Sequence, residues 1–238
     1  MDIQLKTPDD IKIMREAGRI VAQAHAEMKK AVKPGVSTWD LNAIADTVIR
    51  DHGAIPTFIG VPKSDGPDFP AAITASVNHE LVHGIPRKDC ILKEGDIVSL
   101  DTACTYNGFV GDSAYSYGVG EVSPAVQRLL DVGAATLDAA ITASVVPNGI
   151  REVAVATQKC AEDAGYSVAR EYTGHGVGRE MWEPPQIPNW WPRRSNRRLQ
   201  DANVKLQPGM TYAIEPMVIA GRNGLRELSD KWTVVTKD

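Results

Sequence analysis

The chain contains two ten-residue segments with the same pattern of residue types. The first is Leu92-Lys-Glu-Gly95-Asp-Ile-Val-Ser-Leu100-Asp101 and the second is Leu206-Gln-Pro-Gly209-Met-Thr-Tyr-Ala-Ile214-Glu215. In both copies a turn with a glycine precedes an apolar strand, and the strand ends on a carboxylate. Burying an unpaired carboxylate is strongly unfavourable. Two repeated strands that each deliver one acid therefore suggest a cation shared between them.

The regions around the two copies repeat as well, each as two helices followed by strands. Apolar spacing and stop signals predict helices from Pro8 to about 33 and from Thr38 to about 53, then strands at about 54–60, 72–78, 95–105 and 109–118. The second half predicts helices from Pro124 to about 146 and from Ile150 to about 165, then strands near 166–173, 211–219 and 232–237. Chance agreement of two amphipathic helices is the alternative, but the matching strands favour internal duplication. We expect one α+β domain with pseudo-two-fold halves at about 7–118 and 123–238.

The composition is that of an ordinary globular protein. The 238 residues suffice for one large domain or two small ones, and apolar and charged residues make up 43% and 24% of them. A net charge of −4 gives no general reason to expect DNA or a membrane as a partner. Three widely spaced cysteines argue against a disulfide framework or a cysteine zinc site. Because no signal-peptide core or membrane span is apparent, the expected location is the cytoplasm.

A β-hairpin with two acids is predicted around Asn107-Gly108, a dipeptide that favours a two-residue turn. Counting outward from that turn places Asp101 opposite Ala114. Asp112 then lies on the same face as Asp101 and diagonal to it, at ~7–8 Å between backbones. Two carboxylates that converge there repel each other unless a cation lies between them. The alternative is a pair of solvent-facing acids on an edge hairpin.

Two histidine motifs stand out. The run His79-Glu-Leu-Val-His83 matches the H-E-x-x-H letters of zinc proteases, a signature that requires a helix. Because β-like residues precede it and Gly84-Ile-Pro86 follows, an extended backbone is predicted, on which residues four apart lie ~13 Å from each other and cannot share a zinc ion. His175 lies among three glycines in Thr173-Gly-His-Gly-Val-Gly178. This pattern suggests close backbone packing or the approach of a ligand.

On these motifs the chain resembles the type I methionine aminopeptidases, which belong to the metallohydrolases with the pita-bread fold. The matching segments run in the same order and cover nearly the whole chain. They are Asn78 to Pro86, Gly95 to Asp101, Asn107 to Asp112, Gly174 to Gly178 and Pro208 to Met217. The resemblance implies an α+β fold in which helix, helix and strands repeat with pseudo-two-fold symmetry around a curved antiparallel sheet.

The resemblance also implies a centre of two divalent metal ions, held by Asp101, Asp112, His175 and Glu215. Asp101 would bind one metal with both oxygens, and Asp112 would bridge the two. Oxygen ligands with one imidazole suit manganese, iron or cobalt, and zinc is a further option. Glu215 would act as both ligand and proton shuttle, while His83 would hydrogen-bond the substrate near the scissile amide.

A binding region for the methionine side chain follows from the same resemblance. Apolar, polarisable walls suit a thioether, although each of these residues would also suit an ordinary core. The implied substrate-binding residues are Phe58, Phe69, Thr74, Met181, Trp182 and Trp232, together with His83.

Two departures from the family pattern concern the chemistry. Trp182 stands where the family has a histidine, and an indole can donate one hydrogen bond but cannot accept or relay a proton. The family's last metal ligand is a glutamate on a strand just beyond the segment that matches Thr236-Lys-Asp238. We therefore expect one bridging carboxylate and one C-terminal strand of the sheet to be missing.

A third departure is a long loop from Gln186 to Leu199 that carries two tryptophans and four arginines. These are Trp190, Trp191, Arg193, Arg194, Arg197 and Arg198. On an otherwise acidic protein, such a loop is suited to contact ribosomal RNA or the ribosome surface. The alternative, which we favour, is a solvated loop whose tryptophans cover the rim of the active site.

The sequence thus predicts a cytoplasmic metallo-aminopeptidase that removes the initiator methionine from nascent chains. One alternative is a catalytically impaired pita-bread module that binds peptide N-termini or a protein partner, as Trp182 and the missing ligand favour. Another is an enzyme like aminopeptidase P or prolidase, which shares the ligand set. Those relatives usually carry an additional N-terminal domain, for which there is no room before Thr7.

Overall fold

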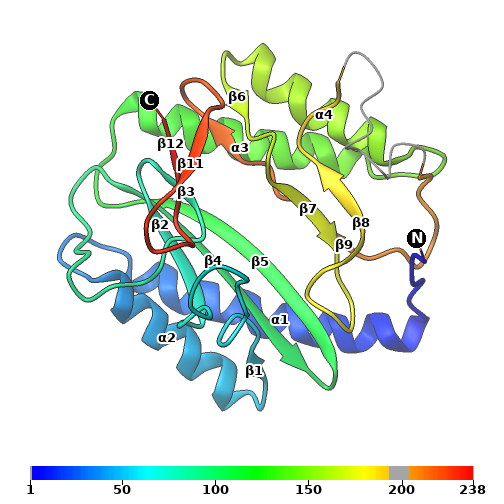
Figure 1. The fold of residues 1–238 in the computed structure, drawn as a ribbon, viewed down its shortest axis with the longest axis horizontal. Coiled ribbons are helices and arrows are strands. Elements are labelled where there is room, and N and C mark those ends of the chain that lie inside the picture. The colour runs from blue at the N-terminus through cyan, green and yellow to red at the C-terminus, as the bar shows by residue number, and fades with distance from the viewer. Residues whose placement is uncertain (1, 193–203, 238) are drawn as a thin grey trace. The chain divides into compact units, whose positions relative to one another are not determined.

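The computed structural model describes residues 2–192 and 204–237 and divides into two compact units. We call Asp9–Gln127 together with Leu225–Lys237 the N-terminal unit. The C-terminal unit consists of Arg128–Gly224 and the segment that precedes Asp9. Figure 1 shows the helices and strands of each unit and labels most of them. The last strands of the chain therefore belong to the N-terminal unit.

The N-terminal unit combines two helices with two antiparallel sheets. The helices are α1 (Pro8–Ala31) and α2 (Thr38–Asp51). In the larger sheet β4 (Ile97–Tyr106) pairs with β1 (Ile55–Pro56), β2 (Ile73–Val77) and β5 (Phe109–Gly118). The smaller sheet has the order β11-β12-β3, with β3 (Glu80–Val82), β11 (Leu225–Glu227) and β12 (Val234–Thr236).

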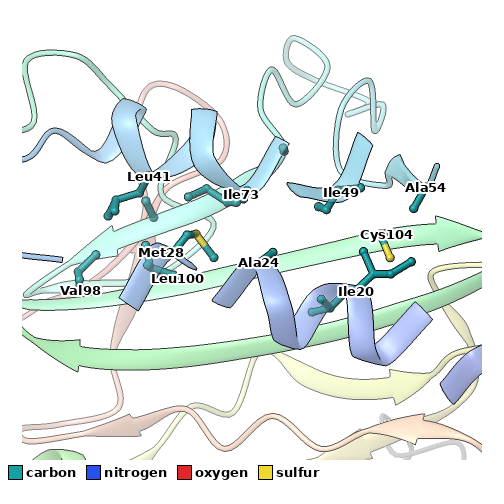
Figure 2. Packing of buried hydrophobic residues seen from close by; sticks show 14 of the residues in the cluster. Ile20, Ala24, Met28, Leu41, Ile49, Ala54, Ile73, Val98, Leu100 and Cys104 are labelled. Atoms are coloured by element: carbon teal, nitrogen blue, oxygen red, sulfur yellow. The ribbon is translucent and has the colours of Figure 1, made fainter. Parts of the chain in front are cut away.

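The core of this unit lies between the two helices and the larger sheet (Figure 2). The apolar residues of α1 recur every three or four positions and so form one buried stripe; those of β4 alternate, as one face of a strand requires. Completely buried members are Val21, Ala24 and Met28 of α1, Leu41 and Ile49 of α2, and Val98, Leu100 and Cys104 of β4. Gly111 of β5 lets α1 approach the sheet, since a Cβ there would lie 2.5 Å from the carbonyl carbon of Ala17.

The C-terminal unit has the same kind of construction. Its helices are α3 (Pro124–Ala143), which begins in the N-terminal unit, and α4 (Ile150–Asp163). One sheet has the order β8-β7-β9, with β7 (Thr173–Gly176), β8 (Glu183–Pro188) and β9 (Tyr212–Ala213). A pair is formed by β6 (Ser167–Val168) and β10 (Val218–Ile219). Ile150 and Val153 of α4 pack with Ile187 and Leu206 in its core.

The two units repeat each other in local detail, as the repeated helix-helix-strand pattern of the sequence predicts. Residue Ser37, before α2, pairs with Ile91, and Gly149, before α4, pairs with Lys205 in the equivalent bridge. Both N-caps are completed by an acid three residues later, because Ser37 N donates to Asp40 and Gly149 N donates to Glu152. The turn glycines of the repeated phrase, Gly95 and Gly209, share a left-handed φ of +86° and +91°.

Several strand predictions were wrong in detail: the strand expected at about 54–60 is only Ile55–Pro56, and the one near 166–173 is reduced to Ser167–Val168, with β7 beginning at Thr173. The expected strand at 211–219 is divided into β9 and β10, because Pro216 lacks the N–H that a central strand needs. Strand β8 was not predicted, and its second half overlaps the loop that the sequence assigned to Gln186–Leu199. Its three prolines suppress the strand pattern, but as an edge strand it tolerates them. Strand β11 was not predicted. Of the helices that the structure describes, none combines the length and apolar character needed to cross a lipid bilayer.

Candidate metal centre

The hairpin of β4 and β5 places two acids on one face of the sheet. Asn107 and Gly108 have φ of +47° and +77°, as the favoured two-residue hairpin turn requires. Asp101 pairs with Ala114 and Ala103 pairs with Asp112, without a register shift. The predicted diagonal arrangement of Asp101 and Asp112 is therefore correct. Both lie on the face opposite the buried residues Leu100 and Cys104 that meet the helices.

Asp112 is in a setting that disfavours a bare negative charge. Burial raises the pKa of its carboxyl to about 7, although a hydrogen bond from the Ser113 backbone partly offsets this effect. A buried carboxylate becomes stable in its charged form when a cation compensates it. The geometry of the hairpin and this electrostatic property both agree with a cation site.

His175 lies on β7, between neighbouring strands that approach unusually closely. A Cβ on Gly174 would lie 2.3 Å from the carbonyl oxygen of Ala213, and one on Gly176 would lie 2.3 Å from that of Pro184. The register places His175 opposite Ala213 of β9. The glycines on each side of His175 are thus required by the packing of β8 and β9 around it.

The imidazole of His175 faces the carboxylate of Glu215. His175 Nδ1 lies 2.9 Å from the carbonyl oxygen of Gly176, and because a carbonyl can only accept, we assign the ring proton to Nδ1. His175 Nε2 lies 3.2 Å from Glu215 Oε1. Burial lowers the pKa of His175, which favours the neutral ring with its Nε2 lone pair toward the carboxylate. Two electron-pair donors that face each other in this way are typical of metal ligands, as is the carbonyl that orients the ring.

His83 follows β3 and is not on a helix. β3 spans Glu80–Val82, and Val82 pairs with Val234 of β12. The extended backbone between His79 and His83 excludes the zinc-protease interpretation, as the sequence predicts. His83 has a left-handed φ of +59°. Burial, and secondarily the charge of Lys63, lowers its pKa to about 4, so its ring is neutral at pH 7.

An aromatic cluster lies beside His83 within the N-terminal unit. The ring of Phe69 stands edge-on to Phe58 and Trp232, with centroid distances of 6.3 Å and 5.1 Å. The ring of Trp232 lies 6.5 Å from that of His83. Thr74 of β2 is buried and pairs with Asp101, which places it beside one of the acids. The structure thus brings Phe58, Phe69, Trp232 and His83 together, whereas Thr74 is shown beside Asp101.

The other two predicted substrate-side residues belong to the C-terminal unit. Met181 is buried, whereas Trp182 is 57% exposed. The Trp182 indole stands edge-on to the His175 ring at a centroid distance of 6.3 Å. Trp182 therefore lies within its own unit beside a predicted metal ligand.

A buried ion pair that the sequence did not predict stabilises the turn that carries Trp182. Lys6 Nζ pairs with Glu183, and the two side chains are only 5% and 7% exposed. Glu183 also accepts hydrogen bonds from the backbone N–H groups of Arg179 and Glu180. The carboxylate thus connects the N-terminal segment to the turn that carries Trp182. The partners lie far apart in the sequence, so no local pattern indicated the pair.

The arginine-rich loop is described only at its beginning. Trp190 Nε1 donates to the carbonyl of Arg170 at 3.2 Å, and the Arg170 guanidinium lies 5.0 Å from the centroid of the indole. The Trp191 backbone donates to Gln158. The four arginines on which the ribosome hypothesis depends, Arg193, Arg194, Arg197 and Arg198, lie outside the described residues.

Comparison with known proteins places the chain in a family. The chain matches the profile of Metallopeptidase family M24 over residues 12–235. A match over most of the chain shows membership, so the chain belongs to metallopeptidase family M24.

Similar proteins narrow the assignment from the family to one group of enzymes within it. "Methionine aminopeptidase 1" of Bacillus subtilis is 45% identical over 233 residues, which are 98% of this chain and 89% of that protein. The crystal structure of methionine aminopeptidase from Rickettsia prowazekii matches with a TM-score of 0.89 at 35% identity, covering 99% of this chain and 90% of that one. Within the family, the chain thus belongs to the methionine aminopeptidases, and the predicted pita-bread fold is confirmed.

The prolidase alternative receives less support. The prolidase from Pyrococcus furiosus has a TM-score of 0.73 and 20% identity, and the match covers 97% of this chain but 60% of that one. Identity this low shows a shared fold and carries no inference about substrate.

Proposed function

We propose that this chain removes the N-terminal methionine of proteins by metal-assisted hydrolysis of the first peptide bond. The observation that carries the proposal is the contact of His175 Nε2 with Glu215 Oε1 at 3.2 Å, in a chain whose relatives include curated methionine aminopeptidases. The two acids on the β4–β5 hairpin support it. The substrate is the exposed N-terminus of a protein or nascent chain.

The chemistry of the proposed ligands suits two divalent metal ions. His175 and Glu215 face each other in one unit, and Asp101 shares a sheet face with Asp112 in the other. Three carboxylates with one neutral imidazole suit manganese, iron or cobalt, and zinc is a further option. When bound, such ions polarise the scissile carbonyl and make water nucleophilic near neutral pH.

The side chains of the protein supply the proton transfers and the orientation of the substrate. Glu215 is suited to accept a proton from the attacking water and to deliver it to the leaving amine. His83, neutral at pH 7, is suited to hydrogen-bond the substrate near the scissile amide. Trp182 offers only an N–H, so it can donate to the substrate carbonyl but cannot relay a proton. Phe58, Phe69 and Trp232 then receive the thioether of methionine, with Thr74 and Met181 as further contacts.

The ligand assignment is tested by Asp112→Asn and His175→Ala. We expect each variant to bind Mn(II) at least ~10-fold more weakly, because each loses a charged or lone-pair donor, and to lose methionine release from Met-Ala-Ser. Asp46→Asn is a matched control, because Asp46 is a partly exposed acid on α2 that pairs with Arg50. Wild-type affinity in both ligand variants would exclude this ligand set.

The exposed indole of Trp182 favours a second candidate function, a module that binds peptide N-termini with little turnover. In that case the wild-type protein binds Mn(II) and Met-Ala-Ser but releases methionine slowly. Trp182→His would then raise the rate of release, because imidazole can both accept and donate a proton. A rate that stays low in Trp182→His would remove Trp182 as the cause of weak catalysis.

The proposed location is the cytoplasm, where nascent chains become accessible. A contact with the ribosome surface through Arg193, Arg194, Arg197 and Arg198 rests on the sequence alone. Replacing the four arginines with glutamate should weaken co-sedimentation with ribosomes in a salt-dependent way. Unchanged co-sedimentation would leave the loop with the rim-covering role that the sequence favours.

A further inference from the structure

A loop with its own charged contacts lies beside the aromatic cluster of the N-terminal unit. We call residues 60–68 the strap. Its base is closed by two backbone hydrogen bonds, from Gly60 N to Phe69 O and from Phe69 N to Val61 O, both at 2.9 Å. Because Phe58 precedes the strap and Phe69 follows it, both ends are anchored in the cluster.

The strap is attached at three points to the end of β11 and to the turn that leads from β11 to β12. Lys63 Nζ lies 2.5 Å from Glu227 Oε2, and Lys231 Nζ lies 3.0 Å from Asp65 Oδ2. The Trp232 indole N–H donates to the carbonyl of Pro67 at 2.8 Å. The turn itself is held by Asp230, which accepts hydrogen bonds from the Trp232 and Thr233 backbones.

Lys63 is the charged residue of the strap that also contacts the indole. Its Nζ lies 5.0 Å from the ring centroid of Trp232, within cation–π distance. Its side chain is 22% exposed, so solvent weakens this attraction without abolishing it. The charge of Lys63 also lowers the pKa of His83, which places the ammonium within electrostatic reach of that imidazole. The indole of Trp232 is thus contacted by Pro67 at its N–H, by the ring of Phe69 and by Lys63 over its face.

We propose that Lys63, held by Glu227, is a positioning residue that fixes the Trp232 wall of the substrate-side cluster and thereby sets its preference for the side chain of the first residue. The inference rests on the proposed function, because it requires that this cluster receives that side chain. A partly exposed ion pair adds little to global stability. The contact of Lys63 with Trp232 should therefore appear in substrate binding and not in folding.

The test compares Lys63→Met with Lys63→Arg and Asp65→Asn. Lys63→Met keeps the apolar stem and removes the charge, whereas Lys63→Arg keeps a cation that can pair with Glu227 and stack on Trp232. Asp65→Asn breaks the other ion pair of the strap, which does not involve Trp232. In Lys63→Met we expect KM for Met-Ala-Ser to rise ~3- to 5-fold, as loss of a cation–π contact of this exposure implies, with kcat nearly unchanged. The preference over norleucyl-Ala-Ser should fall, and Lys63→Arg should restore both.

A second measurement does not depend on turnover. In protein labelled with 5-fluorotryptophan, the ¹⁹F resonance assigned to Trp232 through Trp232→Phe should shift in Lys63→Met and stay in place in Asp65→Asn. An unmoved resonance in Lys63→Met, or equal effects of Lys63→Met and Asp65→Asn on KM, would overturn the role of Lys63. Failure of wild-type protein to release methionine would instead overturn the proposed function, while the ¹⁹F shift would still decide whether Lys63 positions Trp232.

Discussion

Single residues determine how closely the backbone can approach His175. Gly174 and Gly176 leave room for the carbonyl groups of β9 and β8, and a side chain of any size at either position collides with them. The same close packing holds the Gly176 carbonyl against His175 Nδ1, which leaves Nε2 for a metal. The orientation of the imidazole therefore depends on glycine at both neighbouring positions, where any other residue would add a Cβ.

Gly174→Ala should destabilise the protein and weaken metal binding together. The added Cβ would lie 2.3 Å from the Ala213 carbonyl oxygen, so β7 and β9 must separate; we expect a loss of about 1–3 kcal/mol in the free energy of unfolding, as for other overpacked sites. Gly133→Ala in α3 is the matched control. Apart from the neighbouring residues and the backbone of its own helix turn, no atom of the described residues lies within 4 Å of a Cβ placed there, so a gain of ~0.5–1 kcal/mol is expected. Denaturant unfolding measures the stability of the two variants, and equal stability of Gly174→Ala and Gly133→Ala would contradict this explanation.

The metal-free protein should lose stability as the pH rises through neutrality. Burial raises the pKa of Asp112 to about 7 in the folded state, compared with the ordinary value of 3.8. The folded state therefore binds this proton more tightly, and the stabilisation is complete below pH 3.8 and is lost as the pH rises through about 7. Thermal unfolding of EDTA-treated protein between pH 5 and 8 should show this decline. It should be weaker in Asp112→Asn, and a decline of the same size in that variant would assign it to other groups.

Elements differ in how far the sequence predicts them. The register of β4 and β5 could be derived to the residue because Asn107-Gly108 determines the turn and the alternation of side chains does the rest. Counting from the turn also placed Asp101 and Asp112 on the same face of the hairpin. Strand β8, in contrast, was missed because prolines suppress the strand pattern. The pairs Lys6–Glu183 and Lys63–Glu227 could not be predicted, because their partners meet only in the folded chain.

Removing one partner of the buried Lys6–Glu183 pair should be costly. Lys6→Met leaves the carboxylate of Glu183 buried without its cation, and such changes typically cost about 3–5 kcal/mol. The double variant Lys6→Met/Glu183→Leu should recover part of this loss. Lys12→Met serves as the control, since the Lys12–Asp9 pair is 75% and 87% exposed and should contribute almost nothing. Chemical denaturation compares the three, and similar costs for Lys6→Met and Lys12→Met would refute the importance of burial.

On the scale of the whole molecule, the chain returns to its first unit at the end. β12 pairs with β3, so residues 225–237 join the N-terminal unit, although the repeat assigned them to the second half by sequence. The internal duplication was predictable because its phrases recur in order. The pairing of β12 with β3 was not predictable, because a repeat in sequence carries no information about which distant strand the last strand pairs with. Trp232 and Lys231 consequently lie beside Phe69 and Asp65, which come from the first half.

The central claim is that methionine release depends on divalent metal held by these carboxylates and His175. It is tested most directly by stripping the protein with EDTA and measuring methionine release from Met-Ala-Ser while Mn(II) is added back. We predict no release from the stripped protein and a rise to a plateau as Mn(II) binds. Undiminished release after stripping, or saturation with Mn(II) without any release, would contradict the account.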